Sequence, residues 1–223
     1  MTKLLTILCL IFLPTFWGCA GKEVKDAKPA QVLAEEGMAE FNNEDYRKSI
    51  LTFGKLKDWY PFSKLATVAE LKIADANYHI REYQSAIMAY QEFENLHPTN
   101  EAIPYVIYQI GRCWFDQMNT IDRDQTYARK ALESFRRLRR QFPEDAYAVK
   151  AGEHIDVCQR SLAEHEYYVG VFYFKGKHYK AALGRFNGVL TRYPDVGVHR
   201  KALEYIAKCE EKIKNEPEAP TDD

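Results

Sequence analysis

The chain has 223 residues, of which 46% are hydrophobic and 28% charged, with 31 basic and 32 acidic side chains. This composition is that of an ordinary globular chain and excludes bulk disorder and collagen. A formal net charge of -1 gives no overall attraction to nucleic acid, which we do not expect as a partner. Only 11 Gly and 9 Pro accompany 15 Tyr and 12 Phe, so we expect an all-α fold packed on aromatic side chains.

The first 18 residues are typical of an export signal. Lys3 precedes an apolar stretch, Leu4–Trp17, that is too short to cross a bilayer comfortably. Gly18 and Cys19 then resemble the lipobox of bacterial lipoproteins, in which the Cys receives a diacylglyceryl group and becomes the new N-terminus. The resemblance implies a mature chain anchored to a membrane through acyl chains on Cys19. The alternative is a plain cleaved signal with an incidental Cys.

A pattern of small, aromatic and proline residues recurs along the chain with a period of 37 residues. Such internal repetition is the signature of repeat architectures. The third copy carries about eight extra residues, roughly Met118–Gln125, between its halves. The recurring residues, copy by copy, are Gly37, Phe53 and Pro61; Ala74, Tyr90 and Pro98; Gly111, Phe135 and Pro143; Gly170, Phe186 and Pro194.

This pattern resembles the tetratricopeptide repeat, whose unit is a hairpin of two antiparallel helices, A and B. A small residue on helix A lets helix B approach closely, and the aromatic side chain of helix B fills the space between neighbouring units. Each Pro ends a B helix, because Pro cannot continue a helix and restricts the residue before it. The sequence therefore predicts a tetratricopeptide-repeat solenoid of about four and a half helical hairpins.

The C-terminal part is predicted to contain one long helix and one capping helix. Tyr147 to about Lys175 is expected to be a single helix, because neither Gly nor Pro interrupts its middle. Val196–Lys214 repeats helix A without a B partner, as a terminal cap would. Cys113 and Cys209 share a repeat position that requires a small side chain, which free Cys supplies.

The expected organisation follows from these elements. It consists of a signal peptide at 1–18, a lipid-anchored linker at 19–30, repeats 1–3 at 31–145, repeat 4 with the capping helix at 146–214, and a disordered tail at 215–223.

In a tetratricopeptide solenoid the A helices line a concave groove, and the family geometry indicates which residues face it. Most of the candidates are aromatic or apolar, which suits a peptide with apolar side chains. Phe41, Tyr78 and Phe115 are also expected to pack in part between repeats. The candidate groove residues are Met38, Phe41, Leu71, Asp75, Tyr78, Tyr105, Tyr108, Arg112 and Phe115.

We expect no catalytic residues, no cofactor and no metal. The sequence has no nucleophile elbow, no HExxH motif and no phosphate-binding Gly-rich loop. His154, Cys158 and His165 share roughly one face of the long helix, but one helix rarely completes a tetrahedral metal site. We interpret this face as core and edge residues.

The densest basic cluster lies on helix B of the third repeat and comprises Arg136, Arg137, Arg139 and Arg140. We expect it on the convex face, either solvated or in contact with another protein, where it would mainly steer association.

Short motifs in the second half of the chain indicate which family of repeat-containing lipoproteins it resembles. They are Asp122–Asp124 in the insertion, Ala128–Arg129, Glu166–Tyr167, and Arg192–Asp195 together with Arg200. With the lipobox and the repeats, they resemble the BamD family of lipoproteins of the β-barrel assembly machinery over about residues 19–210. The chain ends about one helix earlier than this family does.

The resemblance implies a non-enzymatic scaffold, anchored by lipid in the outer membrane of a Gram-negative bacterium and facing the periplasm. The N-terminal repeats would receive unfolded β-barrel outer membrane proteins. The C-terminal repeats would bind the POTRA domains of BamA, beside the other lipoproteins of the BAM complex. Carried over by position, Arg192, Asp195 and Arg200 are the candidate BamA contacts.

Two alternatives remain open at this point. One is a pilotin-like tetratricopeptide lipoprotein of type IV pilus or secretin assembly, which combines the same anchor and repeats. The other is an envelope metal enzyme that would use His154 and its helical neighbours.

Overall fold

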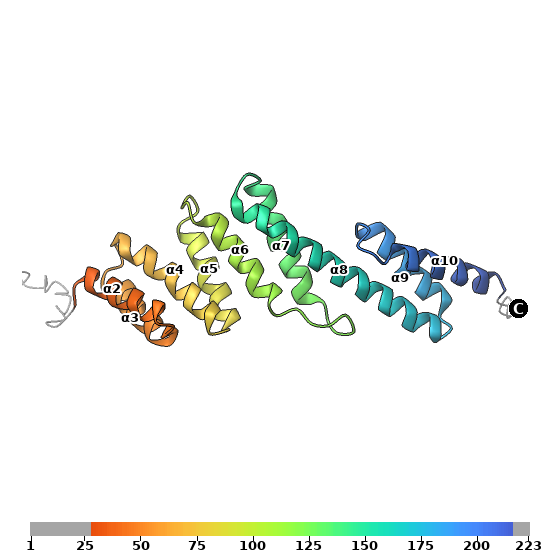
Figure 1. Ribbon diagram of the computed structural model, residues 1–223, viewed down its shortest axis with the longest axis horizontal. Helices are drawn as coiled ribbons and strands as arrows, with labels where there is room; N and C mark the ends of the chain where they lie inside the picture. Colours follow the sequence, from red (N-terminus) through yellow and green to blue (C-terminus); the bar gives the residue numbers. More distant parts are fainter. Residues whose placement is uncertain (1–27, 216–223) are drawn as a thin grey trace, which may run out of the picture.

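The computed structural model describes residues 28–215, and all regular secondary structure in that range is helical (Figure 1). The helices are α2 (Ala30–Asn42), α3 (Tyr46–Trp59), α4 (Lys64–His79), α5 (Tyr83–Leu96), α6 (Ile103–Phe115), α7 (Thr126–Gln141), α8 (Ala146–Lys175), α9 (Tyr179–Arg192) and α10 (His199–Lys214). Cys19 and the tail from 216 lie outside the described residues.

The helices form a ladder of hairpins that follow one another along the long axis of the molecule (Figure 1). The hairpins are α2–α3, α4–α5, α6–α7 and α8–α9, and α10 packs on α9 with no further helix after it in residues 28–215. The predicted all-α solenoid of four and a half hairpins is confirmed, as is the single long helix, α8, with 30 residues.

In three of the four hairpins, an aromatic ring of helix B packs directly on a glycine of helix A. A β carbon built on Gly37 would lie 2.9 Å from a ring carbon of Phe53, and the same distances are 2.5 Å for Gly111 to Phe135 and 2.6 Å for Gly170 to Phe186. Because real β carbons do not approach so closely, only glycine allows the ring to lie directly on helix A. The three Phe side chains are completely buried.

The turns inside three of the hairpins use a left-handed residue other than glycine. Glu44, Arg81 and Lys177 have φ angles of 62°, 63° and 61°, and they occupy equivalent positions in their repeats. The backbone N–H of the next residue then bonds to a carbonyl near the end of helix A, as from Asp45 to Glu40 at 2.9 Å. The sequence does not reveal these turns, because none of the three residues is the usual Gly or Asn.

The prolines end the B helices as predicted. Helices α3, α5, α7 and α9 each end two residues before Pro61, Pro98, Pro143 and Pro194, respectively. The two cysteines at the small-residue position are also buried, with Cys113 and Cys209 both fully inaccessible to solvent.

Helix α8 belongs to two apolar clusters. Its first half contributes Ile155, Cys158 and Leu162 to a central cluster shared with α5, α6 and α7. Its second half begins at Ala163, which joins a separate cluster with α9 and α10. The long helix thus connects the second and third hairpins to the C-terminal unit.

Replacing Gly111 by Val is expected to lower the free energy of unfolding by about 1–3 kcal/mol, because the new side chain displaces the Phe135 ring in a filled core. Urea denaturation followed by circular dichroism measures this change. The control is Gly54→Val in α3, where an added β carbon meets no atom within 4 Å and the change should stay within about 0.5 kcal/mol. Equal losses of unfolding free energy in Gly111→Val and Gly54→Val would contradict the close packing of the Phe135 ring on Gly111.

Candidate partner-binding surfaces

The A helices form the inner side of the ladder. Helix α2 contacts α4 and α6 contacts α8, whereas no two B helices are in comparable contact within residues 28–215. Neighbouring hairpins are therefore closer at their A helices, and the ladder curves toward that side. The predicted groove residues lie on these inner helices.

Asp75 on α4 is buried at the centre of a hydrogen-bond network. Its Oδ1 accepts from the hydroxyl of Tyr90 at 2.8 Å and from the hydroxyl of Tyr105 at 2.7 Å, and Lys72 Nζ donates to its Oδ2 at 2.8 Å. Burial and the nearby carboxylate both disfavour a phenolate, so the pKa of Tyr105 is raised. The network joins α4, α5 and α6 and leaves the side chain of Tyr105 partly exposed on the inner side.

A second network connects α4 with the end of α6. The hydroxyl of Tyr78 donates to Asp116 Oδ2 at 2.5 Å, and Arg112 Nη2 donates to the Tyr78 oxygen at 2.9 Å. Burial, followed by the hydrogen bond to Asp116, raises the pKa of Tyr78. Arg112 and Tyr78 are thus held in fixed orientations across the boundary between two repeats, and both keep some exposed surface.

Tyr108 differs from the expectation for a groove residue. Only 8% of it is exposed, because its ring packs against Phe135 and Tyr147 while its hydroxyl lies 3.0 Å from His154 Nε2. It is a core residue that offers the groove almost no surface. Phe115 is next to this core, with its ring centroid 4.6 Å from that of His154, and remains half-buried.

The three candidates nearest the N-terminus are all half-buried. Met38 packs on the core of the first hairpin and Leu71 on the central cluster. The ring of Phe41 makes edge contacts with Tyr46 and lies 4.7 Å below Lys72 Nζ. The inner side is therefore lined by apolar side chains that are fixed by packing and retain accessible surface.

The insertion between α6 and α7 is attached to the long helix. His165 Nδ1 lies 2.6 Å from the carbonyl oxygen of Ile121, and the Ser161 hydroxyl donates to Gln125 Oε1 at 3.0 Å. Gln125 is itself 2% exposed and donates to two carbonyls of the loop. The sequence analysis did not predict this role of Gln125. The eight-residue insertion indicated a longer loop, but not which residue would attach it to the long helix.

Of the three α8 residues considered as metal ligands, Cys158 and His165 contact the insertion, and His154 contacts the core instead. His154 packs among aromatic rings, Cys158 Sγ lies 3.8 Å from Met118 Sδ, and His165 faces the loop carbonyl. Burial raises the pKa of Cys158 to about 12, so its thiol stays protonated. In the part of the chain that the structure describes, no group of three His, Cys, Asp or Glu is arranged to hold a metal ion.

The C-terminal candidates differ in what their side chains contact. Arg192 Nη2 lies 3.5 Å from Oε2 of the buried Glu166, and the backbone N–H of Gly197 donates to Asp195 Oδ1 at 3.0 Å in the turn before α10. The side chain of Arg200 is 81% exposed, and its one ion pair within residues 28–215 is with Glu204, one helical turn away, at 2.6 Å. Arg200 is therefore the most available of the three for a partner, while Arg192 and Asp195 also stabilise the fold.

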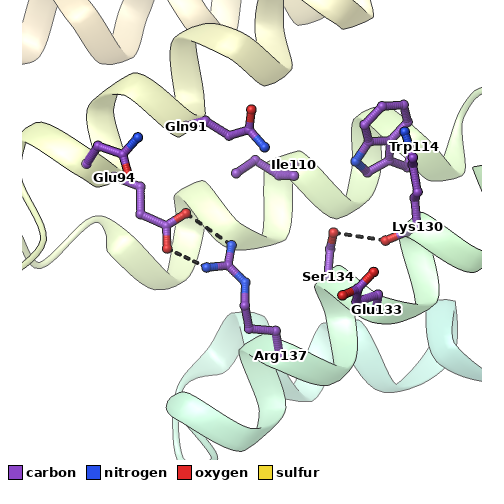
Figure 2. A pocket seen from close by; sticks show the side chains of 9 residues that line it. Gln91, Glu94, Ile110, Trp114, Lys130, Glu133, Ser134 and Arg137 are labelled. Atoms are coloured by element: carbon purple, nitrogen blue, oxygen red, sulfur yellow. Dashed lines mark hydrogen bonds and ion pairs between the residues drawn. The ribbon is translucent and has the colours of Figure 1, made fainter.

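The outer side carries a hollow of about 530 Å³ between α5, α6 and α7 (Figure 2). At one edge, the guanidinium of Arg137 makes a bidentate ion pair with Glu94, at 2.5 and 3.0 Å. At the other edge, Lys130 Nζ lies 4.2 Å from the ring centre of Trp114. The ion pair connects the neighbouring B helices α5 and α7 and separates Arg137 from the other arginines of the basic cluster, whereas the contact between Lys130 and Trp114 joins the two helices of one hairpin.

Together these features define a helical-repeat scaffold with a largely apolar inner side and charged outer hollows. A family model described as YfiO, outer membrane lipoprotein, matches residues 26–222, and the chain belongs to this family.

Its relatives carry one consistent description. A protein of Caulobacter vibrioides is 28% identical over 89% of this chain and 67% of its own length, and one of Rickettsia prowazekii is 30% identical over 86% and 77%. Both are named outer membrane protein assembly factor BamD. A solved structure of MamA from Desulfovibrio magneticus RS-1 aligns with 84% of this chain and 77% of that chain, at 14% identity and a TM-score of 0.42.

Acid is expected to destabilise the protein through His154. Burial, assisted by Arg112, lowers the pKa of His154 in the folded state below its ordinary value near 6.5. As the pH falls below that value, the unfolded chain takes up a proton that the folded chain does not, so stability decreases until the folded pKa is reached. The melting temperature should therefore fall less in His154→Gln than in the unchanged protein between about pH 7.5 and about pH 5.

His178→Gln provides the control, since His178 is exposed at the turn between α8 and α9. This variant should keep the pH dependence of the unchanged protein. A His154→Gln variant with an unaltered pH dependence would show that the buried imidazole is not responsible.

Proposed function

We propose that the protein is a non-enzymatic scaffold of the BAM complex that takes part in the assembly and insertion of β-barrel proteins into the outer membrane. The observation that carries this proposal is the family match across residues 26–222, which spans all the hairpins rather than an isolated motif. The fold supports it, because a ladder of hairpins acts by holding polypeptides in fixed relative positions. The same match favours this role over pilus assembly.

The concave side of repeats 1–3, residues 31–145, is the proposed client surface. Phe41, Tyr78 and Tyr105 are partly exposed there and are held by packing or hydrogen bonds, so little side-chain entropy is lost when a client binds. Aromatic rings of this kind suit the apolar side chains of an unfolded β-barrel precursor.

The C-terminal unit, residues 146–214, is the proposed contact with the POTRA domains of BamA. Arg200 is the main candidate residue, because its charge is exposed and its single ion pair with Glu204 is easily exchanged. Other lipoproteins of the BAM complex are proposed as further partners of the ladder.

Membrane attachment is proposed to come from acyl chains on Cys19. In residues 28–215, no helix is long and apolar enough to span a bilayer. Ala20 and Gly21 follow the cysteine, and the family's sorting rule assigns such lipoproteins to the outer membrane, facing the periplasm. A tethered scaffold raises the effective concentration of client and barrel near each other.

Cys19→Ala should remove the acyl chains and release the protein into the soluble periplasmic fraction, because each buried CH₂ contributes about 0.8 kcal/mol to anchoring. Membrane fractionation followed by immunoblotting measures the distribution. Cys113→Ala is the control and should stay with the membrane. If Cys19→Ala also stays there, the proposed anchor is wrong.

Arg200→Glu is expected to weaken co-purification with BamA, because it reverses an exposed charge without touching the core. Circular dichroism should show unchanged helicity. Lys55→Glu, the same reversal in the first hairpin, is the control and should leave BamA recovery intact. Full recovery of BamA with Arg200→Glu would remove this residue from the proposed interface.

A further inference from the structure

The structure brings together arginines that the sequence places in separate groups. Arg129, Arg136 and Arg140 line one hollow of about 370 Å³ together with Arg192 and Tyr193 from the end of α9. A second hollow of about 410 Å³, between α7 and α8, is lined by Arg136 and Arg140 again and by Arg139. Because they share two arginines, the hollows form one continuous feature, which we call the arginine groove.

The spacing along α7 explains this arrangement. Positions 129, 132, 133, 136 and 140 recur every three or four residues and therefore lie on one face of the helix. From Arg129 to Arg140 that face is about 16 Å long at 1.5 Å per residue. An extended peptide of about five residues has the same length.

The charges of the groove are only partly compensated. Arg129 lies 3.6 Å from Asp124, and Arg192 lies 3.5 Å from Glu166. Arg136, Arg139 and Arg140 form no ion pair within residues 28–215, in contrast to Arg137, which turns away to Glu94. Glu133 and Asp156 are the acidic residues among those that line the groove, against five arginines.

The floor of the groove suits a polypeptide. Leu132, Ile155 and Leu162 are buried apolar side chains beneath the arginines. Gln159 also lines the groove, is 8% exposed, and its amide makes no hydrogen bond to another described residue. Such an amide can pair with a peptide backbone, while the planar guanidinium groups pair with carboxylates through two hydrogen bonds.

We propose that the arginine groove binds an extended acidic segment, about five residues long, of a partner polypeptide. A polypeptide is favoured over a membrane surface because the hairpins α2–α3 and α4–α5 separate the groove from residue 28, where the chain enters from its N-terminal segment. The groove lies on the B-helix side, so it goes beyond the client and BamA contacts proposed above, apart from the shared Arg192.

The test measures binding of a fluorescent peptide to the purified full chain by anisotropy. The peptide alternates Glu and Asp around one Tyr, and a matched peptide carries Gln and Asn in place of the acids. We expect the acidic peptide alone to bind, with an affinity that falls as salt is added. The double variant Arg136→Ala with Arg140→Ala should bind about tenfold more weakly, because it removes two solvent-exposed ion pairs with the peptide.

Arg200→Ala is the matched control and should retain the affinity of the unchanged protein. The two proposals can fail separately. Full BamA recovery with Arg200→Glu would leave the arginine groove proposal standing, and loss of the arginine groove proposal would leave the BamA contact at Arg200 standing. All the substituted arginines are exposed, and an unchanged melting temperature verifies folding.

Several results would overturn the proposal. One is equal binding of the acidic and amide peptides, or no effect of the double substitution. Another is binding to phosphatidylglycerol vesicles that depends on Arg136 and Arg140 while the acidic peptide does not bind, which would make the groove a lipid site. A third is peptide binding only after removal of residues 216–223, because the acidic tail of the chain itself would then be the occupant.

Discussion

The seating of one aromatic ring on one helical glycine sets the geometry of the whole ladder. Where Phe53, Phe135 and Phe186 lie on Gly37, Gly111 and Gly170, two helix backbones approach more closely than any side chain would permit. Ala74 and Tyr90 fill the same positions in the second hairpin, where a hydroxyl on the ring reaches Asp75. Since a small residue faces an aromatic ring in every hairpin, and is glycine in three of the four, the units have similar shapes, and stacking them generates a regular curve.

This regularity explains why most of the fold could be predicted from the sequence. At fixed spacing, a small residue and an aromatic residue determine how the two helices of a hairpin pack, and a proline marks where helix B ends; all three are visible in the printed chain. The long helix was predictable because neither Gly nor Pro interrupts the middle of its segment. The turns could not be predicted, because Glu44, Arg81 and Lys177 adopt a left-handed conformation that their residue types do not favour.

The candidate site was less predictable, because its contacts join residues far apart in the chain. The groove residues were assigned by helix face alone, and that reasoning cannot tell that Tyr108 is covered by Tyr147 and His154 from a helix about forty positions later. The same holds for Gln125 and for the convergence of Arg192 with the arginines of α7. Helix faces can be read from periodicity, but which faces meet depends on the curve of the ladder.

Helix α8 fixes the orientation of the C-terminal unit relative to the hairpins before it. It is 30 residues long, about 45 Å, and its halves are embedded in two different apolar clusters with no turn between them. The angle between the two proposed partner surfaces is therefore fixed by the continuous helix rather than by a hinge. Inserting a single residue near Leu162 would rotate one half of the molecule by about 100° against the other, and lengthen it by only about 1.5 Å. An insertion of one residue here would therefore misalign the first part of the molecule with the C-terminal unit.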